Sequence, residues 1–356
     1  MILRRIPLLI LIAFLFSTVD AQDDAVQFDG ARALQQVADF VAVGERETAT
    51  MGSIEAGNLI LDRLDALGWT TDEDWHVVGF GDRSGLSADA QTTLEYWQPL
   101  NVSDLLGAEL SADAPDARAI RFDPLIIPVR NLVASYGSGA TIIIGAHYDS
   151  RIFADHDADE EKHLDPMPGA NDGGSGVGVL LELARVIGEH YNANNEIRLV
   201  FFDAEDNGHI EPWVSLLPAT SGFIIGSALY ASGLDMQQEN IQYMILVDMV
   251  GDTDQQVPIE GYSNQSAPQI AAGIWAAAAD LGYGDQFITT PRTPITDDHL
   301  PFIQRGIPSV DIIDLDYPYW HTTEDTIDKV SPESLERVGR TLLAYLEQTG
   351  AITPKS

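Results

Sequence analysis

The chain has 356 residues, of which 45% are hydrophobic, and its 19 Lys and Arg residues stand against 55 Asp and Glu residues. That length and apolar fraction suffice for one large α/β domain, or two smaller ones, with a sizeable core. The formal net charge of −36 makes nucleic acids and anionic membranes poor partners, because like charges repel. The chain contains no cysteine, so any metal site has to be built from His, Asp and Glu side chains.

The N-terminus has the pattern of a secretory signal peptide. A basic start precedes an apolar run over residues 6–16, and the small residues Val19 and Ala21 provide a cleavage site. We therefore expect residues 1–21 to be removed and 22–356 to form a single secreted or periplasmic domain, as a monomer. The apolar run is about half as long as a bilayer span requires, so we expect no stable membrane insertion after cleavage. A retained membrane anchor is the alternative.

Apolar residues at helical spacing predict two N-terminal helices, at 31–43 and 53–67, and Gly68 is placed to end the second. Residues 70–128 are mixed in composition, which indicates an extended strand with long surface loops. Beyond them, apolar strands are expected at 131–136, 141–144, 197–202, 243–247 and 309–313, and helices at 176–191, 267–281 and 332–348.

Strands that alternate with helices predict one α/β sandwich with a largely parallel central sheet. The glycines at 137 and 139 separate the strands at 131–136 and 141–144, and this spacing favours a hairpin between them. The chain shows no internal repeat.

Histidine and carboxylate side chains directly follow several of these apolar strands. His147 ends one strand, residues 203–206 follow another, and Asp248 follows a third. In open α/β sheets ligands bind beyond the carboxyl ends of the strands, so these side chains are expected to converge. Histidine and carboxylates are the donors from which proteins build a zinc site with an open catalytic position.

His147 and Asp149 stand two residues apart, so their side chains can point the same way. Asp149 is then placed to accept the second ring N–H of His147, as carboxylates behind metal-bound histidines do. A strand-end histidine paired for structural reasons is the alternative. Asp172 lies in a Gly-rich turn before a helix and is either a ligand or an ordinary N-cap. The turn is acidic and no Lys follows it, which argues against nucleotide binding.

Glu205 and Asp206 are adjacent carboxylates after a buried strand, so one can ligate a metal while the other acts as general base. Asp248 occupies a similar position, where a charge needs a partner. His321 follows Trp320 in a loop before the last helix and is either a ligand or a solvated loop residue. The charged run at 156–163 is interpreted as a solvated loop, with cation binding as the alternative.

The order and spacing of five segments resemble the zinc exopeptidase superfamily, metallopeptidase family twenty-eight, which contains bacterial aminopeptidases and animal-type glutaminyl cyclases. The segments lie at 145–149, 169–176, 202–206, 247–251 and 320–325. The resemblance covers roughly residues 30–348. It implies a single three-layer α/β sandwich around a central mixed, largely parallel sheet, and a zinc cofactor.

The resemblance also implies roles for individual residues. The zinc site shared by the family falls on Asp172, Asp206 and His321. The second site of the two-metal peptidases falls on His147, Asp172 and Asp248. Glu205 takes the role of general acid and base. Position 206 is Asp where family members mostly carry Glu, so the backbone has to lie closer to the metal.

Two features favour the cyclase branch: Trp320 directly before His321, and the segment that begins with Asp297. In cyclases the first Asp of that segment hydrogen-bonds the acidic residue that matches Asp248, and that pairing accompanies a single zinc. Two features oppose it, namely the lack of the animal-type disulfide and Asp311 at a position where the animal enzymes carry histidine.

The leading prediction is a glutaminyl-peptide cyclotransferase that acts on the N-termini of peptides or proteins and releases ammonia. Glu205, Asp297 and Asp248 are its expected catalytic residues, and Trp320 and Trp213 are expected to wall the substrate pocket. The close alternative is a secreted di-zinc aminopeptidase. A non-catalytic extracellular binding module is the third, and the intact Glu205 argues against it.

Overall fold

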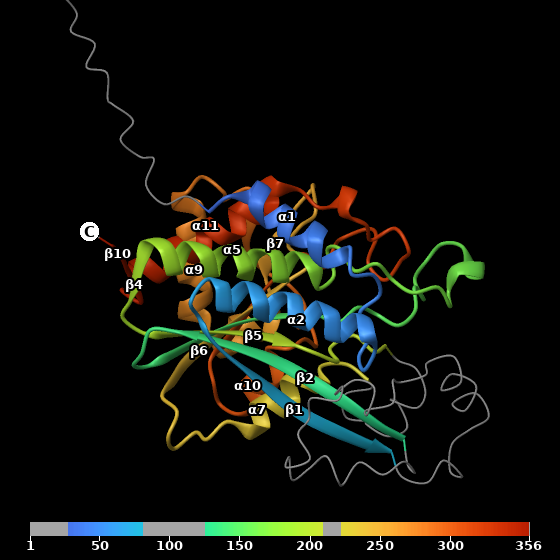
Figure 1. The fold of residues 1–356 in the computed structure, drawn as a ribbon. Helices are drawn as coiled ribbons and strands as arrows, with labels where there is room; N and C mark the ends of the chain where they lie inside the picture. The colour runs from blue at the N-terminus through green and yellow to red at the C-terminus, as the bar shows by residue number, and fades with distance from the viewer. Residues whose placement is uncertain (1–27, 81–124, 209–221, 356) are drawn as a thin grey trace, which may run out of the picture.

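A six-stranded sheet lies at the centre of the computed structural model, which describes residues 28–80, 125–208 and 222–355 (Figure 1). In spatial order its strands are β1 (Thr70–Phe80), β2 (Leu125–Tyr136), β5 (Glu196–Phe202), β3 (Thr141–His147), β6 (Ile241–Asp248) and β9 (Ser309–Ile313). The last four run parallel, whereas β2 is antiparallel to both of its neighbours. The sheet is therefore mixed but largely parallel.

Helices cover both faces of the sheet and give the molecule three layers (Figure 1). One face carries α1 (Gly30–Val41), α2 (Met51–Ala66), α5 (Gly174–His190), α9 (Pro268–Asp280) and α11 (Pro332–Gln348). The other face carries α7 (Ile225–Gly233) and α10 (Leu300–Gln304). Shorter elements are η3 (Glu160–Lys162), α8 (Gly261–Ser266), η4 (Ile327–Lys329) and the strand pairs β4 (Tyr191–Ala193) with β10 (Ile352–Pro354) and β7 (Val257–Ile259) with β8 (Phe287–Pro291).

The central strands are apolar along their whole length because helices bury both of their faces. In β3, Ile142 and Ile144 pack into the larger core beneath α1, α5 and α11, whereas Ile143 packs into the smaller core beside α7 and α10. Every residue of β3 is buried. The alternation of neighbouring side chains between the two cores fixes the register of the strand and the direction in which His147 leaves it.

The predicted fold class is confirmed, and one pairing is wrong. β2 and β3 follow each other in the chain but do not form a hairpin, because β5 lies between them and pairs with both. A strand buried at every residue needs a partner on each side, and β3 finds these in β5 and β6. The strand expected within 70–128 is β1, which pairs with β2 along its whole length.

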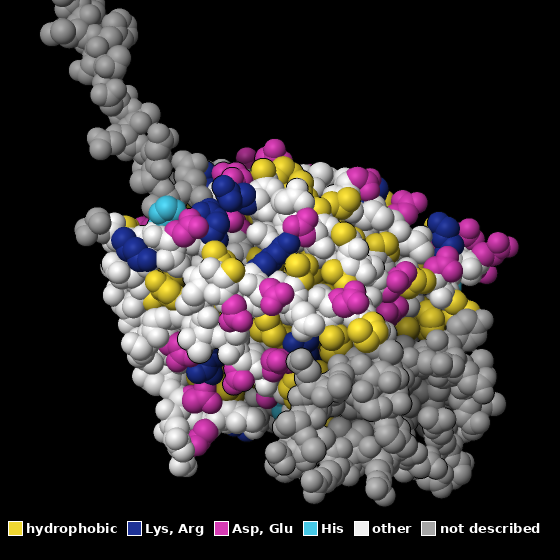
Figure 2. All heavy atoms as spheres, viewed as in Figure 1, with side chains coloured by type: hydrophobic (Ala, Val, Ile, Leu, Met, Phe, Trp, Pro, Cys, Tyr) yellow, Lys and Arg dark blue, Asp and Glu magenta, His cyan; other side chains and the backbone are white. Residues whose placement is uncertain are grey.

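Acidic side chains are spread over the surface, and the face in Figure 2 shows Asp and Glu across it with fewer Lys and Arg between them. None of the helices within the described ranges is long and apolar enough to cross a membrane. The expected signal peptide, residues 1–21, lies outside those ranges.

Candidate metal centre

The carboxyl ends of the parallel strands bring the predicted side chains together. His147 is the last residue of β3, Asp248 is the last residue of β6, and Glu205 and Asp206 follow the end of β5. The turn before α5 and the loop after β9 bring Asp172 and His321 to the same edge. This convergence is the one expected for an α/β sheet, whose ligand sites lie beyond the carboxyl ends of its strands.

One cluster consists of Asp172, Asp206 and His321, each of which offers a ligand atom within 4.8 Å of the others. Nε2 of His321 lies 3.3 Å from Oδ2 of Asp206 and 3.6 Å from Oδ2 of Asp172. Both oxygens are buried and have no hydrogen-bond partner in the described part of the chain. Such oxygens are costly to bury unless a cation satisfies them, so the donor set fits a metal ion. The alternative of a solvated loop histidine is wrong, because His321 is only 4% exposed.

A second cluster consists of His147, Asp172 and Asp248. Nε2 of His147 lies 3.0 Å from Oδ1 of Asp172 and 3.2 Å from Oδ1 of Asp248. Asp172 therefore directs one oxygen to each cluster, as a carboxylate that bridges two ions does. Burial lowers the pKa of His147, but the neighbouring carboxylates, Asp248 foremost, raise it well above its usual value. The same negative charge would attract a metal cation.

The turn that carries Asp172 requires glycine at the next position. Gly173 has a φ of +74°, and a Cβ on it would lie 2.8 Å from Cε1 of His147. Gly173 is also the N-cap of α5, and no side chain caps that helix. The alternative of an N-cap role for Asp172 is therefore wrong. Its side chain is free to face the two histidines.

Asp325 holds the same turn from behind. Its carboxylate accepts the backbone N–H of Asn171 at 2.9 Å and of Asp172 at 3.1 Å, and the hydroxyl of Tyr317 donates to it at 2.7 Å. Burial and the charge of Asp172 raise the pKa of Asp325 to about 7. Asp325 thus connects the loop of His321 to the turn of Asp172 and fixes two candidate ligands relative to each other.

Asp149 plays a different part from the one expected. Its two oxygens accept the backbone N–H of Glu205 at 3.1 Å and of Asp206 at 3.0 Å. The distance from its Oδ1 to Nδ1 of His147 is 3.4 Å, which is long for a hydrogen bond. The main contacts of Asp149 are therefore with the backbone of the loop after β5. Its distance to the His147 ring is that of an ion pair.

Glu205 is a buried carboxyl beside the first cluster, and is 8% exposed. Burial, and then the charge of Asp206, raise its pKa well above the usual value. Asp297 is 3% exposed, and its pKa is also raised, by burial and then by Asp248. A buried carboxyl with a raised pKa is suited to exchange a proton in general acid and base chemistry.

Three residues of this edge have an unusual backbone. Of the five non-glycine residues with positive φ in the described ranges, Ala204, Met249 and His321 belong to the site, with φ of 57°, 43° and 57°. Left-handed conformations of such residues are strained and persist where the surrounding structure imposes them, commonly at functional sites. Ala204 precedes Glu205 and Met249 follows Asp248, so the unusual backbone at these two residues helps to set the directions of the neighbouring carboxyl side chains.

Trp320 forms an aromatic wall next to the first cluster. Its ring centroid lies 4.0 Å from that of His321, and the ring of His156 meets it edge-on at 4.7 Å. Trp320 also packs with Ile295 and Tyr317 in a small apolar cluster. The second expected wall residue, Trp213, lies outside the described residues.

The loop at 156–163 is largely exposed and includes η3. Asp157 ties it to the His321 loop, since its carboxylate accepts from the backbone N–H and the hydroxyl of Thr323. Asp155, His156 and His321 also lie within ligand distance of one another. Both oxygens of Asp155 already accept hydrogen bonds from Arg151, so this group is less suited to a metal.

Sequence reasoning missed Arg151 and Asp325, although both lie in or beside the segments that carry the ligands. Both are buried, with 3% and 0% exposure. A charged residue that lies close in the sequence to candidate ligands is only a weak indication that it contacts one of them. Only the contacts in the structure show that each one holds a candidate ligand.

Residues 131–346 match the sequence profile of peptidase family M28. The chain belongs to this family. It is 30% identical over 211 residues to aminopeptidase YwaD of Bacillus subtilis, a match that covers 56% of this chain and 38% of that protein. The M28 chain thus spans less than half the length of that relative.

Two solved structures resemble this M28 chain over nearly their whole length. A glutaminyl cyclase of Bacteroides thetaiotaomicron, bound to N-acetylhistamine, is 31% identical with a TM-score of 0.73, and the match covers 90% of this chain and 98% of that one. A leucine aminopeptidase precursor of the same organism is 32% identical with a TM-score of 0.72, with 89% and 96% covered. Relatives of both activities therefore share this fold.

Proposed function

We propose that this M28 chain is a zinc-dependent enzyme that acts at the N-termini of peptides or proteins, and that it is a glutaminyl-peptide cyclotransferase. The observation that carries the proposal is Glu205, a buried carboxyl with a raised pKa beside a cluster of His321 and two carboxylates. The fold shared with a glutaminyl cyclase supports it. A mixed imidazole and carboxylate donor set is one that zinc accepts.

The proposed reaction closes an N-terminal glutamine into pyroglutamate. Zinc, when bound by Asp172, Asp206 and His321, supplies Lewis-acid polarisation of the γ-carbonyl group. Glu205 accepts a proton as the α-amine nitrogen bonds to the γ-carbon, and it then delivers a proton to the amide nitrogen, which leaves as ammonia. Water does not attack in this sequence, so no second ion is needed to activate it.

The surroundings of Glu205 suit this substrate. The carboxyl group of Asp297 acts electrostatically on both Glu205 and Asp248, so further polar groups that could hold an α-amine lie beside the proposed base. Trp320 offers a flat apolar wall, and we propose Trp213 as a second one. We further propose that the mature chain begins at residue 22 and works outside the cytoplasm as a monomer. The acidic surface gives no basis for nucleic-acid binding.

A di-zinc aminopeptidase is the second candidate, and one observation favours it. Asp172 points one oxygen at each of two clusters, which is the arrangement of a bridging ligand. In that reaction Glu205 takes the proton of an attacking water. A binding module without activity is less consistent with the site, because Glu205 and the residues expected as ligands are all buried at one edge of the sheet.

Removal of the metal is expected to abolish turnover of a fluorogenic peptide with an N-terminal glutamine. The reason is that Glu205 alone cannot polarise the carbonyl group. Turnover should return when zinc is added to the chelator-treated enzyme. Full turnover by protein shown to be metal-free would contradict the proposal.

His147→Ala separates the two candidate reactions, because His147 belongs only to the second cluster. For a cyclase we expect one zinc per chain, both in the wild type and in the variant, and a preference for N-terminal Gln over Leu substrates. Zinc counting and the paired substrates measure this. Two zinc ions in the wild type, with Leu hydrolysis that collapses in the variant, would establish the aminopeptidase instead.

A further inference from the structure

Arg151 is a buried cation held by two carboxylates. Its Nε and Nη2 donate to the two oxygens of Asp155, each at 2.7 Å, and its Nη1 donates to Oδ1 of Asp206 at 2.5 Å. Burial lowers the pKa of Arg151, but Asp206 and Asp155 raise it above its usual value. A guanidinium is costly to bury without partners, and these contacts supply them. The position therefore requires an arginine, whose planar fork matches this geometry.

The loop after β5 forms a fitted cradle for the guanidinium. Gly208 has a φ of +81°, and a Cβ on it would lie 3.2 Å from Cζ of Arg151. The ring centroid of Phe223 lies 5.4 Å from Cζ. Phe223 is itself joined to Asp206 by a backbone bridge. Gly208 and Phe223, against which Arg151 packs, are thus connected to Asp206 through the backbone. This fixes the side chains of Arg151 and Asp206 relative to each other.

Arg151 leaves Asp206 a single oxygen for an ion. Oδ1 is occupied by the guanidinium, whereas Oδ2 has no hydrogen-bond partner in the described ranges and lies 3.3 Å from Nε2 of His321. The backbone N–H of Asp206 donates to Asp149, so the residue is held at both ends. A rotation that turned Oδ1 toward the cluster would break its hydrogen bond from Arg151.

We propose that Arg151 is a positioning residue of the metal centre, which holds Oδ1 of Asp206 so that Oδ2 alone ligates the ion. This inference rests on the proposed role of Asp206 as a zinc ligand. It also explains how aspartate can serve at position 206. The side chain of aspartate is shorter than that of glutamate, and the hydrogen bond from Arg151 orients its carboxylate toward the cluster.

Two effects of Arg151 on zinc affinity oppose each other. Its positive charge repels a cation, whereas its hydrogen bond orients a ligand. Asp155 offsets the charge by pairing with Nε and Nη2 of the guanidinium, so Arg151 and Asp155 together add little net charge to the site. Orientation therefore dominates. Loss of a partner behind a ligand commonly weakens metal binding about 10–100-fold, and we expect a loss in that range for Arg151→Met.

Zinc affinity, measured by competition with a chromogenic chelator, tests the proposal. Arg151→Met is expected to bind zinc about 10–100-fold more weakly than the wild type, and Arg151→Lys, which keeps the charge without the fork, to lie between them. In an Asp206→Glu background, Arg151→Met should weaken zinc binding by a smaller factor, because a longer carboxylate can offer the ion both oxygens. A general loss of folding would act equally in both backgrounds.

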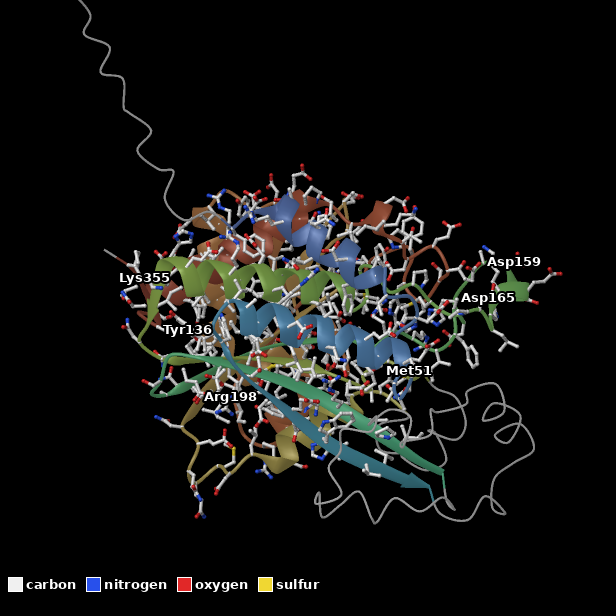
Figure 3. The ribbon with its side chains drawn as sticks, viewed as in Figure 1. Met51, Tyr136, Asp159, Asp165, Arg198 and Lys355 are labelled. Carbon is white, nitrogen blue, oxygen red and sulfur yellow. The ribbon has the colours of Figure 1, made fainter. Side chains whose placement is uncertain are left out.

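Arg198→Met is the matched control. Arg198 also pairs with two carboxylates, those of Glu196 and Glu239, and lies on β5. Figure 3 shows it on the opposite side of the molecule from Asp159 and Asp165, which lie in the loop that follows Asp155. We expect its zinc affinity to stay within about twofold of the wild type, since it has no contact with a ligand.

The outcomes separate the two proposals. Zinc affinity of Arg151→Met within twofold of the wild type, or an equal loss in both backgrounds, would overturn the role of Arg151. If Arg151→Met does not fold, wild-type affinity in Arg151→Lys overturns it as well. Asp206→Asn decides the underlying assumption, because wild-type zinc affinity in that variant would show that Asp206 is no ligand, whatever Arg151 does.

Discussion

His321→Ala is expected to lose the bound zinc and the enzymatic activity together. His321 is the one imidazole of the first cluster, and its Nε2 faces both carboxylates there. Three protein ligands are the usual minimum for a catalytic zinc site, so removal of one leaves two carboxylates with no nitrogen donor. We expect less than about a tenth of the wild-type zinc to remain after dialysis, with turnover at background, because affinity falls with each lost ligand.

Zinc analysis of the dialysed protein, paired with a turnover assay, measures this result. His299→Gln is a suitable control, because His299 is also a fully buried histidine between carboxylates, with Nε2 3.2 Å from Glu260. It removes a buried imidazole without removing a proposed ligand, so its zinc content should match the wild type. A His321→Ala protein that keeps its full zinc would remove His321 from the ligand set.

The fold was largely predictable because the strong patterns are local. The strand at 309–313 and the helix at 332–348 were expected at the bounds that β9 and α11 have in the structure. Both have clear signals, a short apolar run in one case and an amphipathic repeat after a proline in the other. The hairpin between β2 and β3 was wrong because strand pairing is not local, and a glycine turn does not show that β5 inserts between them.

The convergence of the candidate ligands could be predicted from the sequence, but the contacts that hold them could not. His147, Asp206 and Asp248 could be placed because they follow apolar strands, and the ends of parallel strands meet at one edge. The partners of the ligands could not be placed, because Arg151 and Asp325 act through contacts that only the tertiary structure creates. The same holds for Asp149, whose main contacts are backbone N–H groups of the loop after β5.

Glu205→Gln is expected to keep its zinc and to lose turnover by about 10²–10⁴-fold, the usual contribution of a general acid or base. Glutamine has nearly the same shape as glutamate, so the loop that Asp149 holds should not move. It cannot accept and return a proton, however. The loss corresponds to about 3–5 kcal/mol of activation free energy. The ligands that the proposal assigns to the ion do not include Glu205, so zinc content should equal that of the wild type.

Asp206→Asn is the matched comparison, since it makes the same chemical change one residue further along the chain. It should lose zinc, because a neutral amide oxygen is a weaker ligand than a carboxylate and the clamp from Arg151 loses its charged partner. The two variants, assayed for zinc and for kcat with the same glutamine substrate, assign the two roles. If Glu205→Gln loses its zinc while Asp206→Asn keeps it, the roles are reversed: Glu205 is then the ligand, and Asp206 stands in the place of the base.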